Sequence, residues 1–101
     1  MEFSLEKLDG KSIITLDKNI SVGLDAAKIQ NTIIDLLEEG SKIIVVDLSK
    51  LNYITSWGIG ILIYAFSTCS NKNVDFYLTG VNERVLNILK RIKVDKIITI
   101  K

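Results

Sequence analysis

The 101-residue sequence has no histidine, no proline, and only one cysteine and one tryptophan. Without histidine, the chain lacks the most common general base, the most common activator of a nucleophile and the most common zinc ligand. The lone cysteine, Cys69, cannot form an internal disulfide framework, and the apolar helical pattern around it predicts a buried, inert thiol. Histidine-dependent catalysis and a fold held by disulfides are therefore excluded.

An excess of charge of either sign is also missing. The 13 Lys and Arg residues nearly balance the 12 Asp and Glu residues, for a formal net charge of +1, so the sequence indicates no binding to nucleic acid or to anionic lipid. The opening segment, MEFSLEKLDG, lacks the basic and apolar regions of a signal peptide. The longest uncharged apolar run, residues 57–66, is too short to cross a bilayer. We therefore expect a soluble, cytoplasmic protein with no direct membrane insertion.

Linkers, internal repeats and low-complexity tracts are absent from the sequence as well. A chain of 101 residues can bury one hydrophobic core but not a second one. Its content of 48% hydrophobic and 25% charged residues is ordinary for a folded globular protein. The sequence therefore predicts a single compact domain over residues 1–101.

Hydrophobic periodicity divides the chain into strands and helices. Apolar residues alternate on either side of Asp9-Gly10, which predicts an antiparallel hairpin, and the β-branched run 42–48 predicts a strand buried on both faces. The order β-β-α-β-α-β-α-β predicts the α/β class, with a mixed β-sheet and helices packed against it. The expected strands are 2–8, 12–17, 42–48, 74–80 and 96–100, and the expected helices are 24–40, 56–70 and 82–92.

The segment YITSWGIGIL, residues 53–62, places a polar pair directly before an apolar helical run. A nucleophile elbow needs a glycine two residues before and two residues after the serine, but Ser56 has Ile54 before it and only Gly58 after it. No histidine is present to activate Ser56 either, so hydrolysis is disfavoured. The pair Gly58 and Gly60 lacks the third glycine of a dinucleotide fingerprint and the Gly-Lys of a P-loop, so nucleotide binding is disfavoured too. Two roles for Ser56 remain, as a helix cap and as a site of phosphorylation.

Ser56 stands immediately before the helical pattern, where a serine hydroxyl can accept a free backbone N–H and stabilise the helix by about 1 kcal/mol. A phosphate on Ser56 would also be favoured there by the backbone N–H groups and by the helix dipole. Capping does not explain Gly58 and Gly60, which cost helix stability in the first turn. Small residues at these positions indicate either close backbone packing or a surface that is open to a partner.

The segment IIVVDLSKLNYITSWGIGIL resembles the core of STAS domains, and in particular the anti-sigma factor antagonists of bacteria. Asp47-Leu48-Ser49 matches the end of the family's hydrophobic strand, and residues 55–60 match its Asp-Ser-Ser-Gly-Leu-Gly helix opening. The order of elements and the segment VNERVLNILKRIKVDKIITI are also similar to the family. The resemblance implies a STAS-like fold over nearly the whole chain.

The resemblance also implies a function. In this family a partner anti-sigma factor, itself a protein kinase, phosphorylates the first serine of the motif, which corresponds to Ser56. The unphosphorylated form binds the anti-sigma factor and frees the sigma factor, and a serine phosphatase resets the cycle. Three positions depart from the family pattern: Thr55 replaces the acid of the motif and is an alternative phosphoacceptor, Trp57 replaces its second serine, and Ser21 replaces an acid that many relatives carry before the first helix.

A second apolar stripe runs along the expected 56–70 helix, beside the one that faces the core. Trp57, Ile61 and Tyr64 recur at i, i+4 and i+7. A partner could cover these side chains, in which case they would border a docking surface together with Thr55 and Ser21. Alternatively a neighbouring helix covers them, and the same stripe could equally support a homodimer.

Asp47 has a structural explanation of its own. An acid at the end of a buried strand most often accepts hydrogen bonds from a nearby loop, so we expect Asp47, with Gly58 and Gly60, to support the segment that carries Ser56.

Three functions are compared on this basis. The first is a bacterial anti-sigma factor antagonist that is not an enzyme and needs no cofactor or metal. The second is a constitutive STAS scaffold or subunit, in a stress-signalling assembly or a lipid-transport ATPase complex, without phosphorylation. The third, a small hydrolase that uses Ser56, is disfavoured by the absence of histidine.

Overall fold

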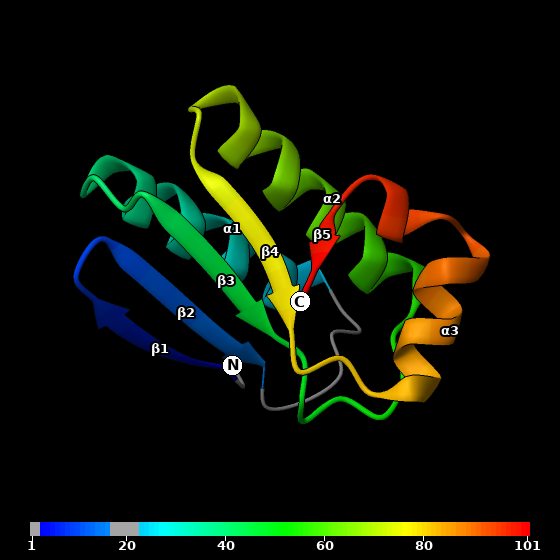
Figure 1. Ribbon diagram of the computed structural model, residues 1–101. Helices are drawn as coiled ribbons and strands as arrows, with labels where there is room; N and C mark the ends of the chain where they lie inside the picture. The colour runs from blue at the N-terminus through cyan, green and yellow to red at the C-terminus, as the bar shows by residue number, and fades with distance from the viewer. Residues whose placement is uncertain (1–2, 17–22) are drawn as a thin grey trace.

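The structure is a computed structural model that describes residues 3–16 and 23–101, with the backbone alone for residues 23–26. These residues form five strands and three α-helices in the order β-β-α-β-α-β-α-β that the sequence predicts (Figure 1). The strands are β1 (Phe3–Leu8), β2 (Lys11–Leu16), β3 (Ile43–Asp47), β4 (Asp75–Thr79) and β5 (Thr99–Ile100), and the helices are α1 (Gly23–Glu38), α2 (Ser56–Asn71) and α3 (Glu83–Arg91).

The predicted hairpin is confirmed. Strands β1 and β2 pair antiparallel, from Phe3 opposite Leu16 to Leu8 opposite Lys11. Gly10 has a φ of +72° in the turn between them, a conformation that glycine adopts without steric cost. The Asp9-Gly10 signal therefore identifies both the turn and the register of the strands that flank it.

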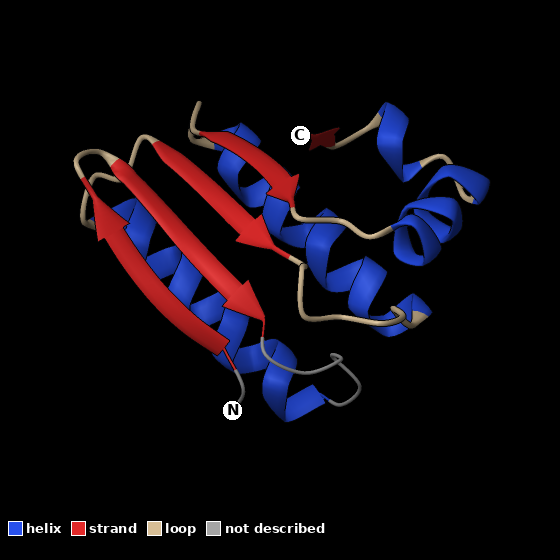
Figure 2. Cartoon of the chain, turned by 60° about the horizontal axis from the view of Figure 1, so that its bottom comes forward, coloured by secondary structure: helices blue, strands red, loops and turns tan. Residues whose placement is uncertain are grey.

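The sheet is mixed, with the strand order β1-β2-β3-β4-β5. Strands β2, β3, β4 and β5 run parallel to one another, and each is connected to the next through one helix. Right-handed crossovers between neighbouring parallel strands put successive helices on the same face of the sheet. Figures 1 and 2 show α1 and α2 side by side behind the sheet, with α3 beyond α2 near the β5 edge.

The core lies between the sheet and these helices. In β2, Ser12, Ile14 and Leu16 are buried, while the alternate residues are half-buried. In β3, Val45 is buried although it points away from the helices, because Ile13 of β2 and Tyr77 of β4 lie on either side of it. The prediction of a central strand buried on both faces is thus confirmed for its middle residues.

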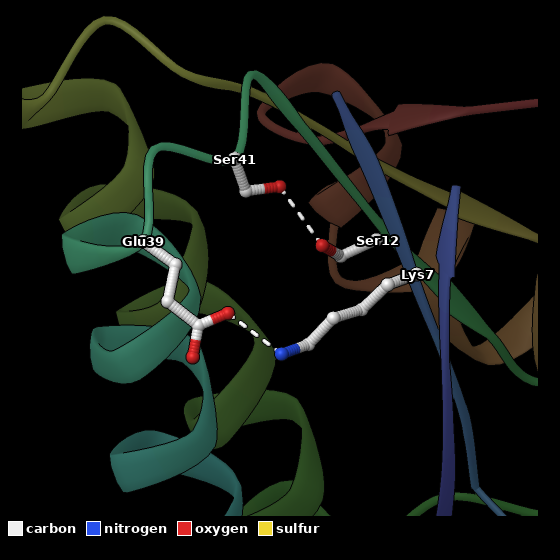
Figure 3. Close-up of polar contacts among 4 residues, drawn as sticks. All are labelled: Lys7, Ser12, Glu39 and Ser41. Atoms are coloured by element: carbon white, nitrogen blue, oxygen red, sulfur yellow. Dashed lines mark hydrogen bonds and ion pairs between the residues drawn. The ribbon is translucent and has the colours of Figure 1, made fainter. Parts of the chain in front are cut away.

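A polar cluster fastens the hairpin to the turn that leads from α1 into β3 (Figure 3). The ammonium group of Lys7 lies 2.6 Å from a carboxylate oxygen of Glu39. The hydroxyls of Ser12 and Ser41 are 2.9 Å apart. Gly40, between Glu39 and Ser41, has a φ of +91°, as expected for a glycine that ends a helix. Because Ser41 precedes β3, this cluster lies at the opposite end of that strand from Asp47.

The last strand differs most from the prediction. A strand is expected over residues 96–100, but β5 contains only Thr99–Ile100. A 3₁₀ turn over Val94–Lys96 precedes it, and Lys93 adopts a φ of +66° at its start. The turn buries Val94 and brings Ile98 into the core, so tertiary packing rather than the β-branched composition decides the backbone conformation here.

Candidate functional site

The site begins at the end of β3. The carboxylate of Asp47 accepts a hydrogen bond from the backbone N–H of Ser49 at 2.8 Å. The N–H of Leu48 donates to the carbonyl of Thr79 at 2.9 Å, and a Cβ atom placed on Gly80 would lie 2.6 Å from the Asp47 carboxylate. Asp47 therefore lies where the loop after β3 meets the turn after β4. It is hydrogen-bonded to the loop after β3, as the sequence predicts. The turn after β4 approaches it so closely that only glycine fits at position 80.

Asn82 links the loop after β3 to the start of α3. The sequence analysis did not predict this role. The side-chain carbonyl of Asn82 accepts the N–H of Val85 at 2.9 Å, which caps α3. Its amide donates to the carbonyl of the buried residue Leu51 at 2.6 Å. The cap could have been recognised from an asparagine just before a helical pattern. The bond to Leu51, 31 residues away, has no sequence signal.

The residue that caps α2 is Thr55, so the prediction that Ser56 is the cap is wrong. Thr55 is extended, and its hydroxyl oxygen accepts the N–H of Gly58 at 3.1 Å. Its carbonyl accepts the N–H of Ile59 at 2.9 Å. Ser56 is instead the first helical residue, and its side chain is exposed. Both residue types are good caps, and only the backbone conformation decides between neighbours.

Helix α2 carries no charged residue over its whole length, residues 56–71. In particular, no acidic residue lies in its first turn. The positive potential of the free N–H groups at this end is therefore not offset by a carboxylate of the helix itself. An anion attached to Ser56 would be stabilised by that potential.

A hollow of about 310 Å³ lies between α1 and α2, next to Ser56. Trp57 and Tyr64 line it and are 54% and 58% exposed, whereas Ile61, which also lines it, is only 5% exposed. The amide of Gln30 on α1 donates to the carbonyl of Ile61 at 3.5 Å. The predicted stripe is thus divided: α1 helps to cover its middle residue, and its two aromatic residues remain open. The hollow is lined by Ala27, Gln30, Ser56, Trp57, Gly60, Ile61 and Tyr64.

The two glycines of α2 have different surroundings. Gly58 is buried, whereas Gly60 is exposed. A Cβ atom on Gly60 would meet nothing within 4 Å. The sequence leaves two explanations for these glycines, close backbone packing or an open surface. The open surface therefore applies to Gly60.

The remaining candidate residues complete the description. Ser21 lies outside the described residues. Cys69 is buried, and burial raises the pKa of its thiol from 9.0 to about 11, which agrees with the inert thiol that the sequence predicts.

Within the described ranges, no three His, Cys, Asp or Glu side chains gather as they would to hold a metal ion. Among the helices of that same part of the chain, none has the length and apolar character needed to cross a membrane.

Comparison with known proteins gives one family and several similar folds. The family model of the STAS domain matches residues 2–101. No curated protein is a significant match by sequence. A candidate anti-sigma factor antagonist from Thermotoga maritima is 26% identical, with a TM-score of 0.83 over 97% of this chain and 84% of that chain.

Two further structures share the fold at lower identity. The anti-sigma factor antagonist SpoIIAA, solved in its unphosphorylated form, is 15% identical, with a TM-score of 0.80 over 98% of this chain and 87% of that chain. A sulfate transporter family protein from Wolinella succinogenes is 20% identical, with a TM-score of 0.77 over 87% of this chain and 70% of that chain.

Proposed function

Since this chain belongs to the STAS domain family, we propose that it is a partner-switch regulator of the anti-sigma factor antagonist type. In its unphosphorylated form it binds an anti-sigma factor that is also a serine kinase. The kinase phosphorylates Ser56, and a serine phosphatase restores the free hydroxyl. The chain acts in the bacterial cytoplasm as the substrate of these enzymes and is not itself an enzyme.

The exposure of Ser56 at the start of α2 is the observation that carries this proposal. The hydroxyl of the adjacent Thr55 accepts the N–H of Gly58 as the helix cap, so a phosphate on Thr55 would disturb the cap. A phosphate on Ser56 would add a charge of about −1.5 to −2 at a helix end that favours anions. Ser56 is therefore the better acceptor of the two hydroxyls, and the fold can carry the modification without rearrangement.

Binding and modification use the same surface in this proposal. Ser56 lines the hollow together with the exposed aromatic rings of Trp57 and Tyr64, and such rings are frequent anchors of protein interfaces. A phosphate at the edge of an apolar contact would have to lose its water when a partner docks, and burial of an unpaired charge is costly. Phosphorylation thus weakens docking without a change of shape.

The relatives support this function in part. The Thermotoga maritima protein is a candidate anti-sigma factor antagonist, and SpoIIAA is an antagonist whose structure was solved in an unphosphorylated form. A constitutive STAS subunit is the second candidate, because a sulfate transporter family protein has a similar fold. The large exposed Trp57 in place of the motif's second serine also favours a permanent contact.

Phosphopeptide mass spectrometry on the protein isolated from its own cells, in growth and under stress and with phosphatases blocked, separates the two candidates. We expect phosphate on Ser56 in at least one condition. Phosphate on Thr55 alone would move the switch to that residue. Complete coverage of the peptide around α2 without any phosphate would refute the switch and favour the constitutive subunit.

The variant Ser56→Glu tests the consequence for binding. A carboxylate at this position imitates part of the phosphate charge and interacts favourably with the helix N-terminus, by about 0.3–1 kcal/mol. We therefore expect unchanged or slightly higher stability together with weaker binding of the co-purified partner, whereas Ser56→Gln should keep both. Equal partner binding by all three proteins would contradict a charge-controlled switch.

A further inference from the structure

The segment that connects α3 to β5 carries the densest positive charge in the chain. Residues 90–97, KRIKVDKI, include four cations and one acid, a formal charge of +3, whereas the whole chain carries only +1. The remaining residues therefore carry a formal charge of −2. The small net charge is the reason that the sequence analysis expects no binding to anionic lipid, but it hides this local excess. Figure 1 shows the segment at the end of the molecule, beyond α2.

The backbone brings these cations close together. The N–H of Lys93 donates to the carbonyl of Lys90 at 3.1 Å, and the N–H of Lys96 donates to the carbonyl of Lys93, also at 3.1 Å. Each such turn keeps its two end Cα atoms within about 7 Å of each other. The three lysines and Arg91 are all exposed. We call this surface the basic corner; it contains Lys90, Arg91, Ile92, Lys93, Lys96 and Ile97.

The charge of the basic corner is not balanced by nearby acids. Within the part of the chain that the structure describes, none of its four cations forms an ion pair. The only acid of the segment, Asp95, is half-buried, and one of its carboxylate oxygens lies inside the protein. Cations in the last turn of a helix complement its dipole, which explains Lys90 and Arg91. It does not explain Lys93 and Lys96, which lie beyond the end of α3.

Two isoleucines are exposed among these cations. Ile92 and Ile97 are 48% and 50% exposed, although Val94 and Ile98 of the same segment are buried in the core. Cations beside exposed aliphatic side chains are typical of segments that lie on anionic membranes, where the cations contact lipid headgroups and the apolar side chains enter the layer beneath. Nucleic acid would use the cations but not the isoleucines, because bases stack on aromatic rings.

We propose that the basic corner is a docking site for the surface of an anionic membrane. Its four cations contact lipid phosphates, and Ile92 and Ile97 enter the headgroup layer. Shape favours a membrane over an acidic peptide, because peptides dock in grooves or along sheet edges, whereas the corner is a helix end followed by a tight turn. The contact is peripheral and reversible. This inference goes beyond the proposed function and uses none of the residues around Ser56.

Co-sedimentation of the full chain with lipid vesicles tests the docking site. The wild type should bind vesicles made of equal parts of phosphatidylglycerol and phosphatidylcholine, and it should not bind vesicles of phosphatidylcholine alone. Binding should weaken as the NaCl concentration rises from about 50 to about 300 mM, because salt screens exposed charges. Lys93→Glu should weaken binding by about tenfold or more. Ile97→Ser, or Ile92→Ser as a second variant of this kind, should weaken it by about threefold or more.

Two matched variants control for charge and for apolar surface. Lys28→Glu makes the same change of charge at an exposed position of α1. Leu8→Ser removes an apolar side chain that is 49% exposed on β1, at the opposite edge of the sheet from β5. Both variants should bind like the wild type, and circular dichroism verifies that every variant is folded.

Three results would overturn the proposal. The first is a wild-type protein that binds the anionic vesicles no better than the neutral ones. The second is an equal loss in Lys93→Glu and Lys28→Glu, which would indicate a general effect of charge. The third is wild-type binding by both isoleucine variants, which would assign the basic corner to an acidic protein segment or a nucleic acid. None of these results depends on Ser56, so failure of the docking site and failure of the switch are distinguishable.

Discussion

Two adjacent hydroxyl residues at the start of α2 have separate tasks. Thr55 caps the helix through the N–H of Gly58, while Ser56 is exposed on the first turn. Thr55→Ala should therefore lower the free energy of unfolding by about 1 kcal/mol, whereas Ser56→Ala should change it by less than about 0.5 kcal/mol. Urea denaturation measures both, and Thr55→Ser, which keeps the accepting oxygen, should retain most of the wild-type stability. A larger loss in Ser56→Ala than in Thr55→Ala would contradict this assignment.

The sequence does not show which of these two residues caps α2. A threonine and a serine in succession are both suitable caps, and the apolar pattern that follows does not fix the first helical residue to better than one or two positions. The motif and its location could be predicted from residues 53–62. The division of roles could not, because it depends on the extended backbone of Thr55.

The thiol of Cys69 predicts a specific dependence on pH. Burial raises its pKa from 9.0 to about 11, so between these values the unfolded chain loses the thiol proton while the folded chain keeps it. The unfolded state then binds fewer protons, and the free energy of unfolding falls as the pH rises. Urea denaturation of the wild type and of Cys69→Ala should show a stability difference that shrinks through this window. All other side chains are the same in both proteins, so a constant difference would show that the thiol does not contribute.

At the scale of one element, the composition of α2 is a compromise between helix stability and an open surface. Gly60 costs helix stability, but a Cβ atom there would meet nothing within 4 Å. Gly60→Ala should therefore raise the free energy of unfolding by about 1 kcal/mol. Gly80→Ala is the contrasting variant: its φ is +67°, and the new Cβ atom would lie 2.6 Å from the Asp47 carboxylate. We expect a loss of about 1–3 kcal/mol.

Thermal and urea denaturation of the two glycine variants measure these opposite effects. Destabilisation by Gly60→Ala would mean that the open space is filled in solution. Tolerance of Gly80→Ala would mean that the turn after β4 can move away from Asp47.

Elements with a strong periodicity were predicted well, and the exception has a physical cause. Helix α2 and strands β1 to β4 lie within a few residues of their expected bounds. Helix α2 and the hairpin strands have apolar patterns that extend over several turns or alternations, and β3 is marked by an apolar run long enough for a buried strand. The β-branched residues 97–100 carry no such repeat. The chain uses Ile98 and Val94 to fill the core, and the strand is reduced to two residues.

At the scale of the whole molecule, topology explains why the site lies where it does. Parallel strands β3 and β4 end at the same edge of the sheet, so the loop after β3 that leads to Ser56 and the loop after β4 that leads to α3 start side by side. The order of strands and helices along the chain predicts that these strands run parallel, whereas their adjacency in the sheet is a finding of the structure. The sequence does not predict how the loops are joined, because the bond from Asn82 to the Leu51 carbonyl links positions 31 residues apart.

Asn82 should therefore control the order of the loop that carries Ser56. In Asn82→Asp the side chain can still cap α3, because a carboxylate accepts the N–H of Val85, but it can no longer donate to the carbonyl of Leu51. We expect a loss of about 1–3 kcal/mol for the unsatisfied carbonyl. Hydrogen exchange should become faster at the N–H of Leu51, which bonds to Leu48, while the N–H of Val85 stays protected.

Comparison with Asn82→Ala separates the two functions of this side chain, because Asn82→Ala removes both the cap and the bond to Leu51, whereas Asn82→Asp removes only that bond. Asn82→Ala should therefore accelerate exchange at both N–H groups, at Leu51 in the loop and at Val85 in the first turn of α3. If the N–H of Leu51 is as well protected from hydrogen exchange in Asn82→Asp as in the wild type, contacts other than the bond to Asn82 order the loop before Ser56. The edge of the sheet would then position Ser56 without help from α3.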